Sequence, residues 1–133
     1  MKLVLPLIAT LTAFPLSAQA NDFSITFDWS DLKKCTSGMP KTVKNPTFSL
    51  QNVPDGTTWI HFKLTDLNVP GYNHGGGWVE YKGQSIIEPG AFDYKSPCPP
   101  NGQHEYRWTV SAKSKKSSFG GTIGQAKASK IYP

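Results

Sequence analysis

HEYRWTVSA, residues 104–112, decides the fold class of this chain. Apolar and polar residues alternate strictly in it, and the apolar members are Tyr106, Trp108, Val110 and Ala112. A period of two places successive side chains on opposite faces of an extended strand. This stretch is therefore predicted to be a strand that covers a hydrophobic core with one face only.

The same pattern recurs on both sides of residues 104–112. Further strands are predicted at FSITFDW (23–29), WIHFKLTD (59–66), WVEYKG (78–83) and, more weakly, TIGQAKASKIY (122–132). Turn-forming residues separate these runs, in PDG (54–56), VPGYN (69–73), EPGAF (88–92) and PPNGQ (99–103). No window has the period of an amphipathic helix. We therefore expect a mainly β fold, a small sandwich or barrel with short connecting loops and few or no helices.

The first twenty residues, MKLVLPLIATLTAFPLSAQA, have the composition of a secretory signal peptide. One lysine precedes an apolar run, and Ala18-Gln19-Ala20 provides a small-x-small cleavage pattern. The alternative is a membrane anchor, but the run is shorter than a spanning helix requires and prolines interrupt it. We expect cleavage after Ala20 and a single domain over 21–133, exported to the periplasm or secreted from a bacterial cell, with no transmembrane segment in the mature chain.

The sequence contains two cysteines, Cys35 and Cys98. In an exported protein a small, even number of cysteines favours a disulfide, so we expect these two to be bonded. The alternative is a catalytic thiol, which an oxidising compartment disfavours. The formal net charge is +5, but the basic residues are scattered along the chain. A nucleic-acid partner is therefore not expected, whereas a weak attraction to anionic lipid remains compatible with this charge.

Residues 73–78 read NHGGGW, and a histidine followed by glycines is how lipases form an oxyanion hole. That fold also needs a G-x-S-x-G nucleophile motif and a much longer α/β chain, and this sequence has neither. A metal site is also not expected, because His61, His74 and His104 have no close ligand spacing. The glycines instead predict a turn in which positive φ is tolerated.

Polar residues end two of the predicted strands on their apolar faces. Asp66 continues the series Ile60, Phe62 and Leu64, and His104 opens the series that contains Tyr106. An acid, an imidazole and a phenol are therefore expected to meet at one end of the sandwich, where they would face a cavity or water. The alternative is an Asp–His pair whose role is only structural.

Three segments of the sequence resemble the motifs of a known protein family. They are NPTFSLQNVPDGTTWIHFKLTDLNVP (45–70), HGGGWVEY (74–81) and YKSPCPPNGQHEYRWTVSA (94–112). Together they resemble the phosphatidylethanolamine-binding protein family, in particular its bacterial branch. The resemblance implies a β-sandwich with a small pocket that binds anions such as phosphate head groups. It further implies that the ligand-binding residues are Asp66, His104 and Tyr106, with Pro100 and Gly102 in the pocket wall.

The chain departs from the family pattern at several positions. Leu67 and Asn68 replace the proline and the second acid of the family's turn, and Glu105 replaces an arginine. Gly77 stands where the family has a histidine, and we expect His74 to reach the pocket in its place. The NHGGGW glycines would then shape the pocket.

The sequence thus predicts a binding module for a small anionic or zwitterionic ligand, such as a phospholipid head group, without cofactor and without turnover. A hydrolase of phosphate or carboxylic esters is the alternative, with Asp66 and His104 as an acid–base pair. A module that binds a protein partner, as a protease inhibitor does, is the third possibility.

Overall fold

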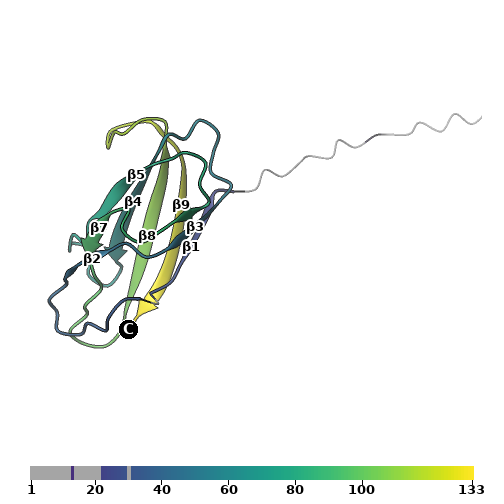
Figure 1. Ribbon diagram of the computed structural model, residues 1–133. Helices are drawn as coiled ribbons and strands as arrows, with labels where there is room; N and C mark the ends of the chain where they lie inside the picture. The colour runs from purple at the N-terminus through teal and green to yellow at the C-terminus, as the bar shows by residue number, and fades with distance from the viewer. Residues whose placement is uncertain (1–12, 14–21, 30) are drawn as a thin grey trace, which may run out of the picture.

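The structure is a computed structural model that describes residue 13 and residues 22–29 and 31–133. The described residues form nine strands and no helix, which confirms the expected fold class (Figure 1). No helix in this part of the chain is long and apolar enough to cross a membrane. The predicted signal peptide, residues 1–20, lies outside the described residues except for residue 13 and stays a prediction.

The largest sheet has four antiparallel strands in the order β5-β4-β8-β9. Their bounds are β4 (Trp59–Asp66), β5 (Gly76–Glu80), β8 (His104–Lys113) and β9 (Thr122–Tyr132). β4 and β8 pair along their whole common length, so Leu64 lies opposite Trp108 and Asp66 lies opposite Tyr106. Because the two strands are antiparallel, the last residue of β4 and the first residues of β8 meet at the same end of the sheet.

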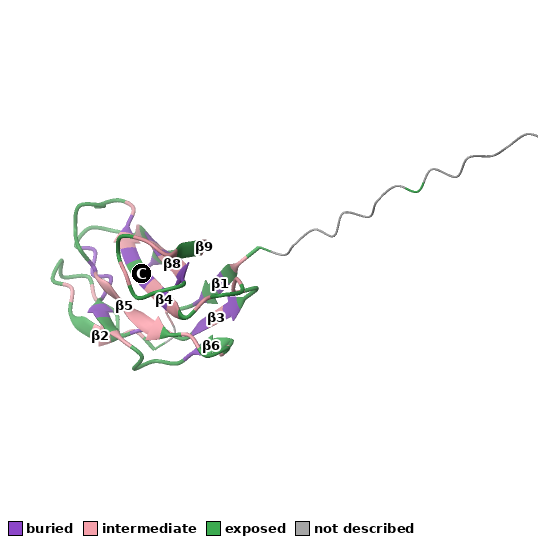
Figure 2. Cartoon of the chain, turned by 90° about the horizontal axis from the view of Figure 1, so that it is seen from above, coloured by how far each residue is buried: buried purple, intermediate pink, exposed green. Residues whose placement is uncertain are grey.

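Two smaller antiparallel sheets form the second layer of the sandwich (Figure 2). The first has the order β1-β3-β6, with β1 (Ser24–Phe27), β3 (Phe48–Gln51) and β6 (Ile86–Ile87). The second pairs β2 (Thr42–Lys44) with β7 (Asp93–Lys95). The second layer is therefore interrupted between two sheets, while the four-stranded layer is continuous.

The hydrophobic core lies between the layers and is rich in aromatic rings. Trp108 is completely buried, and its ring lies 5.1 Å from Phe48, 5.9 Å from Phe92 and 5.0 Å from Tyr94. Full burial of such a side chain stabilises the folded state by roughly 2–3 kcal/mol. The contacts join β8 to the second layer, so the alternation in residues 104–112 holds the two layers together.

The predicted strands agree with the observed ones to different degrees. WIHFKLTD has the predicted bounds, and β8 and β9 match their predicted runs to within one residue. The prediction at 78–83 is wrong in its bounds, because β5 covers 76–80 and therefore includes two glycines. Glycine contributes nothing to a hydrophobic period. β1 covers 24–27 and lies inside the predicted run 23–29. The strands β2, β6 and β7 have only two or three residues, too few to show a period, and the four-residue β3 was also not predicted.

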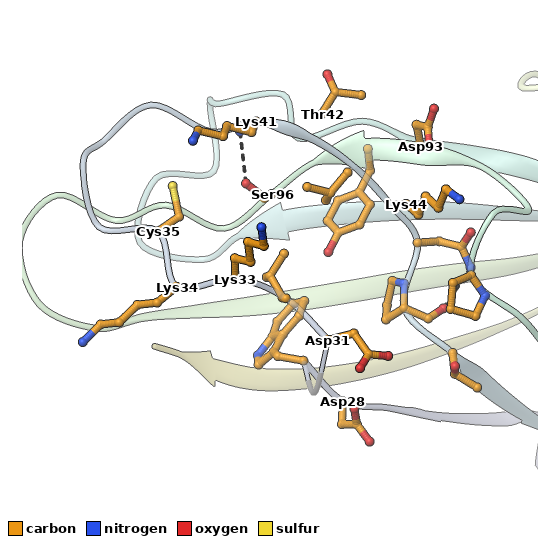
Figure 3. A pocket seen from close by; sticks show the side chains of 18 residues that line it. Asp28, Asp31, Lys33, Lys34, Cys35, Lys41, Thr42, Lys44, Asp93 and Ser96 are labelled. Atoms are coloured by element: carbon orange, nitrogen blue, oxygen red, sulfur yellow. Dashed lines mark hydrogen bonds between the residues drawn. The ribbon is translucent and has the colours of Figure 1, made fainter.

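A disulfide joins Cys35 to Cys98, as the sequence predicted, and closes a loop with a sequence separation of 63 residues. Two segments, 35–41 and 96–98, run beside each other around this bond. The Gly38 amide donates to the Cys98 carbonyl over 3.1 Å, and the Ser96 amide donates to the Lys41 carbonyl over 2.8 Å. The Lys41 amide donates to the Ser96 hydroxyl over 3.0 Å (Figure 3). This disulfide-linked wall, segments 35–41 and 96–98, closes the end of the sandwich at which β4 ends and β8 begins.

Candidate ligand-binding pocket

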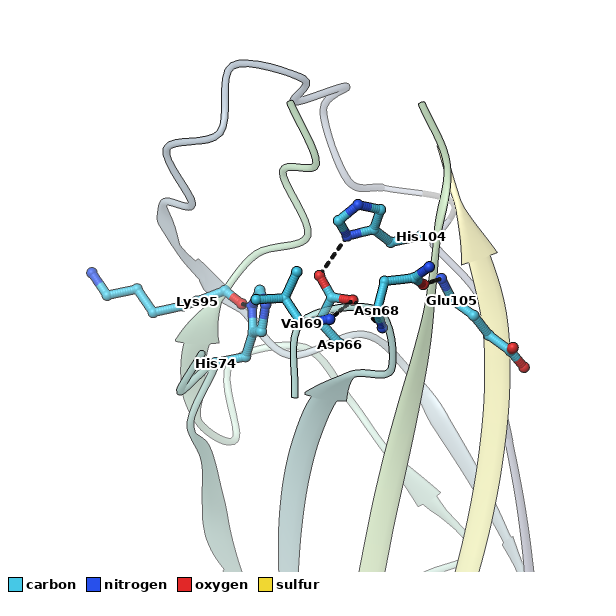
Figure 4. Close-up of polar contacts among 7 residues, drawn as sticks. All are labelled: Asp66, Asn68, Val69, His74, Lys95, His104 and Glu105. Carbon is cyan, nitrogen blue, oxygen red and sulfur yellow. Dashed lines mark hydrogen bonds and ion pairs between the residues drawn. The ribbon is translucent and has the colours of Figure 1, made fainter. Parts of the chain in front are cut away.

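The shortest polar contact at this end of the sandwich joins Asp66 to His104. The His104 Nδ1 atom lies 2.6 Å from the Asp66 Oδ2 atom (Figure 4). Asp66 is 4 % exposed, and it ends the buried face of β4 just as the alternation predicted. The antiparallel register places Asp66 opposite Tyr106, so the start of β8 brings His104 to the carboxylate.

Asp66 is ionised in this arrangement. Burial alone would raise the pKa of its carboxyl group, but hydrogen bonds to the carboxylate outweigh burial and hold the pKa below its usual value. The donors are the His104 ring and the backbone amides of Asn68 and Val69, at 2.9 and 3.1 Å. Because the carboxylate can only accept, the His104 Nδ1 atom carries a hydrogen, and the second ring nitrogen of His104 is left for a ligand.

Tyr106 lies on the same face and is almost completely buried. Burial raises the pKa of its hydroxyl group, and the negative charge of Asp66 together with a hydrogen bond to that carboxylate raises it further. The hydroxyl is therefore protonated and donates toward Asp66. Tyr106 thus helps to stabilise the carboxylate.

His74 forms the opposite side of the site. It is 2 % exposed, and its Nδ1 atom lies 2.8 Å from the Lys95 carbonyl oxygen. A carbonyl accepts, so Nδ1 carries the hydrogen and Nε2 presents a lone pair. Burial lowers the pKa of this histidine, which keeps the ring neutral at pH 7. Its ring packs edge-on against Tyr106 at 5.5 Å and against Tyr72 at 4.6 Å.

These side chains surround a hollow of about 220 Å³, here called the Asp–His pocket. Its lining consists of Gly38, Pro40, Asp66, Val69, Tyr72, His74, Cys98, Pro99, Pro100, His104 and Tyr106. The structure therefore brings together Asp66, His74, Pro100, His104 and Tyr106. Gly102 is not in the lining; it lies in the turn before β8 with a φ of 77°. The lining residues that sequence reasoning missed come from loops, where no periodicity marks them.

The departures from the family pattern lie outside this lining. Glu105 is exposed and points away from the pocket (Figure 4). The Asn68 side chain accepts a hydrogen bond from the Glu105 amide over 2.9 Å, so it ties the turn after β4 to the start of β8. Gly77 lies in β5, and a Cβ atom there would come within 2.4 Å of the Phe92 side chain. The added acid at 105 therefore does not enter the pocket.

The glycines of NHGGGW have separate roles, and none of the three lines the Asp–His pocket, contrary to the expectation that they shape it. Gly75 has a φ of 74°, and its amide donates to the Asn73 side-chain oxygen over 2.9 Å. Gly76 and Gly77 lie inside β5, where they allow close approach to β4 and to Phe92. Only His74 of this motif lines the pocket.

No group of three or more residues that could hold a metal ion occurs in the described part of the chain. His61 lies on the outer face of β4, where its ring packs against Trp78 at 4.6 Å. It is therefore separated by the sheet from the other two histidines.

Asp66→Asn is expected to remove part of the acid sensitivity of the fold. Because the folded pKa of Asp66 is lowered, its contribution to stability is present above the unfolded pKa of about 3.9 and is lost as pH falls through the folded value. The variant should be less stable than wild type by about 2 kcal/mol at pH 6, and this difference should shrink toward pH 2.5.

Urea denaturation at several pH values measures this difference. Asp55→Asn, in an exposed turn, is the matched control and should leave the loss of stability at acidic pH unchanged. A difference between wild type and Asp66→Asn that stays constant with pH would contradict the assignment of the acid sensitivity to Asp66.

Comparisons with known proteins agree with this architecture. The sequence profile of the family described as "Phosphatidylethanolamine-binding protein" matches residues 8–131. A search of the curated proteins found no significant match. Among solved structures, the homologue CT736 of Chlamydia trachomatis is 15 % identical, with a TM-score of 0.61 over 85 % of this chain and 98 % of that one. Escherichia coli YbcL, described as a member of the mammalian PEBP family, is 14 % identical, with a TM-score of 0.55 over 84 % and 98 %. At these identities the two structures show the fold alone, while the profile covers nearly the whole chain, and the chain therefore belongs to the phosphatidylethanolamine-binding protein family.

Proposed function

We propose that this chain is an exported binding protein that holds a small zwitterionic head group, of the phosphoethanolamine type, in the Asp–His pocket. The observation that carries the proposal is the arrangement of charges there. An ionised Asp66 and the His74 lone pair are acceptors, and the free Nε2 atom of His104 becomes a donor when that ring is protonated.

The two ends of such a ligand find different partners in the pocket. A ligand ammonium group would pair with Asp66 and with the Nε2 atom of His74. A ligand phosphate would accept a charge-assisted hydrogen bond from the Nε2 atom of a protonated His104, whose Nδ1 atom lies 2.6 Å from Asp66. A bare phosphate would lack a partner for Asp66 and would be repelled by it, which favours a zwitterion over a simple anion.

The size of the pocket favours a head group over a whole lipid. Sites for drug-sized ligands measure about 300–1,000 Å³. At about 220 Å³ the Asp–His pocket lies below this range. The family to which the chain belongs and the presence of a disulfide both support a ligand-binding role in an oxidising compartment.

We propose binding without turnover. The pocket lining includes no serine, threonine or lysine within the described part of the chain, and its one cysteine is bonded in the disulfide. The burial that raises the pKa of Tyr106 also makes its hydroxyl a poor nucleophile. General acid–base chemistry by Asp66 and His104 would have to act alone, and such chemistry usually contributes only ~10²–10⁴-fold.

His104→Ala is expected to weaken phosphoethanolamine binding about tenfold or more, because it removes the charge-assisted donor. Titration of phosphoethanolamine into ¹⁵N-labelled protein, followed by NMR, measures the affinity. Shifts of the amides in residues 66–74 and 104–106 show that the ligand binds in the Asp–His pocket. His61→Ala is the matched control, since it removes an imidazole from the outer face and should leave the affinity unchanged.

Equal affinity in wild type and His104→Ala would place the ligand elsewhere. Hydrolysis of phosphate or carboxylic esters that disappears in His104→Ala would replace the binding role with the enzyme alternative.

A further inference from the structure

A second and larger hollow lies where the second layer of the sandwich is interrupted. It has a volume of about 660 Å³, three times that of the Asp–His pocket, and the proposed function does not use it. We call it the lysine groove. Its lining comes mainly from residues 28–29 and 31–35 after β1 and residues 41–47 around β2, together with Pro89, Asp93, Tyr94 and Ser96.

The inner surface of the lysine groove is largely apolar. Trp29, Leu32 and Val43 line it and pack partly buried against the core, and the buried Tyr94 lies beside them. Burial raises the pKa of the Tyr94 hydroxyl, which therefore stays protonated. The Tyr94 residue is only 4 % exposed. The groove thus contains apolar side chains together with a mostly buried phenol.

One side of the groove is a free strand edge. Just outside the β2–β7 pair, the Asn45 amide donates to the Phe92 carbonyl and the Ser96 amide donates to the Lys41 carbonyl. By the alternation of an antiparallel ladder, Val43 also bonds toward β7, while the backbone groups of Thr42 and Lys44 point away from it. No other strand pairs with β2 in the described part of the chain. Such an edge can accept an added strand.

The charges around the groove are segregated. Lysines 33, 34 and 41 lie toward the end where Cys35 lies, whereas the other end carries Asp28, Asp31, Asp93 and one lysine, Lys44 (Figure 3). The only ion pairs among the described residues are Lys82–Glu80 and His104–Asp66, so none of the three clustered lysines is paired with a carboxylate. One end of the groove is therefore positive, and the other end is predominantly negative.

The edge is held rigidly. Asn45 follows β2 directly and is 1 % exposed. Its side chain donates to the carbonyls of Pro46 and Glu88 over 2.8 and 3.0 Å and accepts from the amides of Gly90 and Phe92 over 3.0 Å. At its other end β2 continues into the disulfide-linked wall. A partner would thus meet a preformed edge, which lowers the entropic cost of binding.

We propose that the lysine groove binds an extended peptide segment that adds antiparallel to β2. β2 runs from the positive end of the groove, at Lys41, to the end that carries Asp93. An antiparallel segment runs the other way, so its amino-terminal part meets the aspartates and its carboxyl-terminal part meets the lysines. The segment that fits is basic first, apolar in its middle and acidic last. Its central backbone bonds to Thr42 and Lys44, and its apolar side chains contact Val43 and Leu32.

The hexapeptide Lys-Val-Thr-Val-Glu-Glu is the probe, titrated into the ¹⁵N-labelled full chain and followed by NMR. The expected result is a set of shifts at residues 31–34 and 42–44 that saturates. An excess of phosphoethanolamine should not displace the peptide, which separates this proposal from the proposed function. The same peptide N-methylated at its Val-Thr-Val residues keeps its side chains. It should lose most of its affinity, because these residues have lost their backbone donors.

Two variants test the edge and the charges separately. Lys44→Pro removes an amide that points away from β7, a position where an edge strand tolerates proline, and should weaken binding about five- to tenfold relative to Lys44→Gln. The triple variant Lys33→Gln/Lys34→Gln/Lys41→Gln should weaken binding about tenfold. Its control, Lys63→Gln/Lys115→Gln/Lys127→Gln, removes the same charge from exposed positions outside the groove and should bind as wild type does.

Three results would overturn the proposal. The first is equal binding of the N-methylated peptide, and the second is binding of dodecanoate but not of the peptide, which would make the groove a lipid site. The third is the absence of shifts in the groove at a peptide concentration of about 1 mM, because this concentration would reveal even a weak, millimolar affinity.

Discussion

Gly76→Ala is expected to lower the free energy of unfolding by about 4 kcal/mol or more. Single substitutions cause losses of this size only when they create a severe structural conflict. A Cβ atom at this position would lie 1.8 Å from the Phe62 carbonyl oxygen and 2.6 Å from its carbon. Both atoms belong to the backbone of β4, which is paired on its other side with β8. The strand cannot move away without breaking that pairing, so the conflict cannot be relieved by a side-chain rotation.

Chemical denaturation of the purified variant measures this loss. Gly75→Ala is the matched control one residue earlier: its φ of 74° disfavours alanine, but no atom lies within 4 Å of the added Cβ. It should cost about 1–2 kcal/mol. Similar losses for the two variants would contradict the view that close strand approach, rather than backbone conformation, requires glycine at 76.

The double variant Cys35→Ala/Cys98→Ala is expected to lose about 4 kcal/mol, because the unfolded chain regains the entropy that a closed loop of this length removes. For a domain of this size the midpoint of thermal unfolding should fall by roughly 15 °C. The loss should appear in wild type after reduction as well, whereas the reductant should have no effect on the variant.

Thermal unfolding followed by circular dichroism, with and without reductant, measures the midpoints of wild type and of the variant and the effect of the reductant on each. A midpoint that moves by only a few degrees in the variant would mean that the hydrogen bonds of the disulfide-linked wall already order the segments without the bond. The variant is also informative for ligand binding, since Cys98 lines the Asp–His pocket and Cys35 lines the lysine groove.

Strict alternation explains why the main features of the site could be predicted. Asp66 and His104 each extend an apolar series by one polar residue, and antiparallel pairing of neighbouring strands brings such ends together. The observed 2.6 Å contact between Asp66 and His104 lies where these strand ends meet. The cysteine pairing could also be predicted, because a chain with two cysteines has one possible intramolecular disulfide.

Other features depend on neighbours that no local pattern reveals. Gly76 is required by the backbone of β4, and Gly77 by the Phe92 ring, so the reason for each glycine lies in another segment. Pro40 and Tyr72 reach the Asp–His pocket from loops, whose residues show no period. The lysine groove escaped prediction for a similar reason, since β2 has only three residues and the gap beside it is a property of how the sheets are placed.

The disulfide-linked wall contributes to both hollows. Lys41, Ser96 and Cys35 line the lysine groove, whereas Pro40 and Cys98 of the same two segments line the Asp–His pocket. A head group and a peptide would therefore not compete for space, but each would act on the same two segments. Any change that one ligand makes to this wall would alter the affinity for the other, and by thermodynamic reciprocity the factor would be the same in both directions. The bond that stabilises the fold thus also makes heterotropic linkage between a small molecule and a peptide possible in a domain of this size.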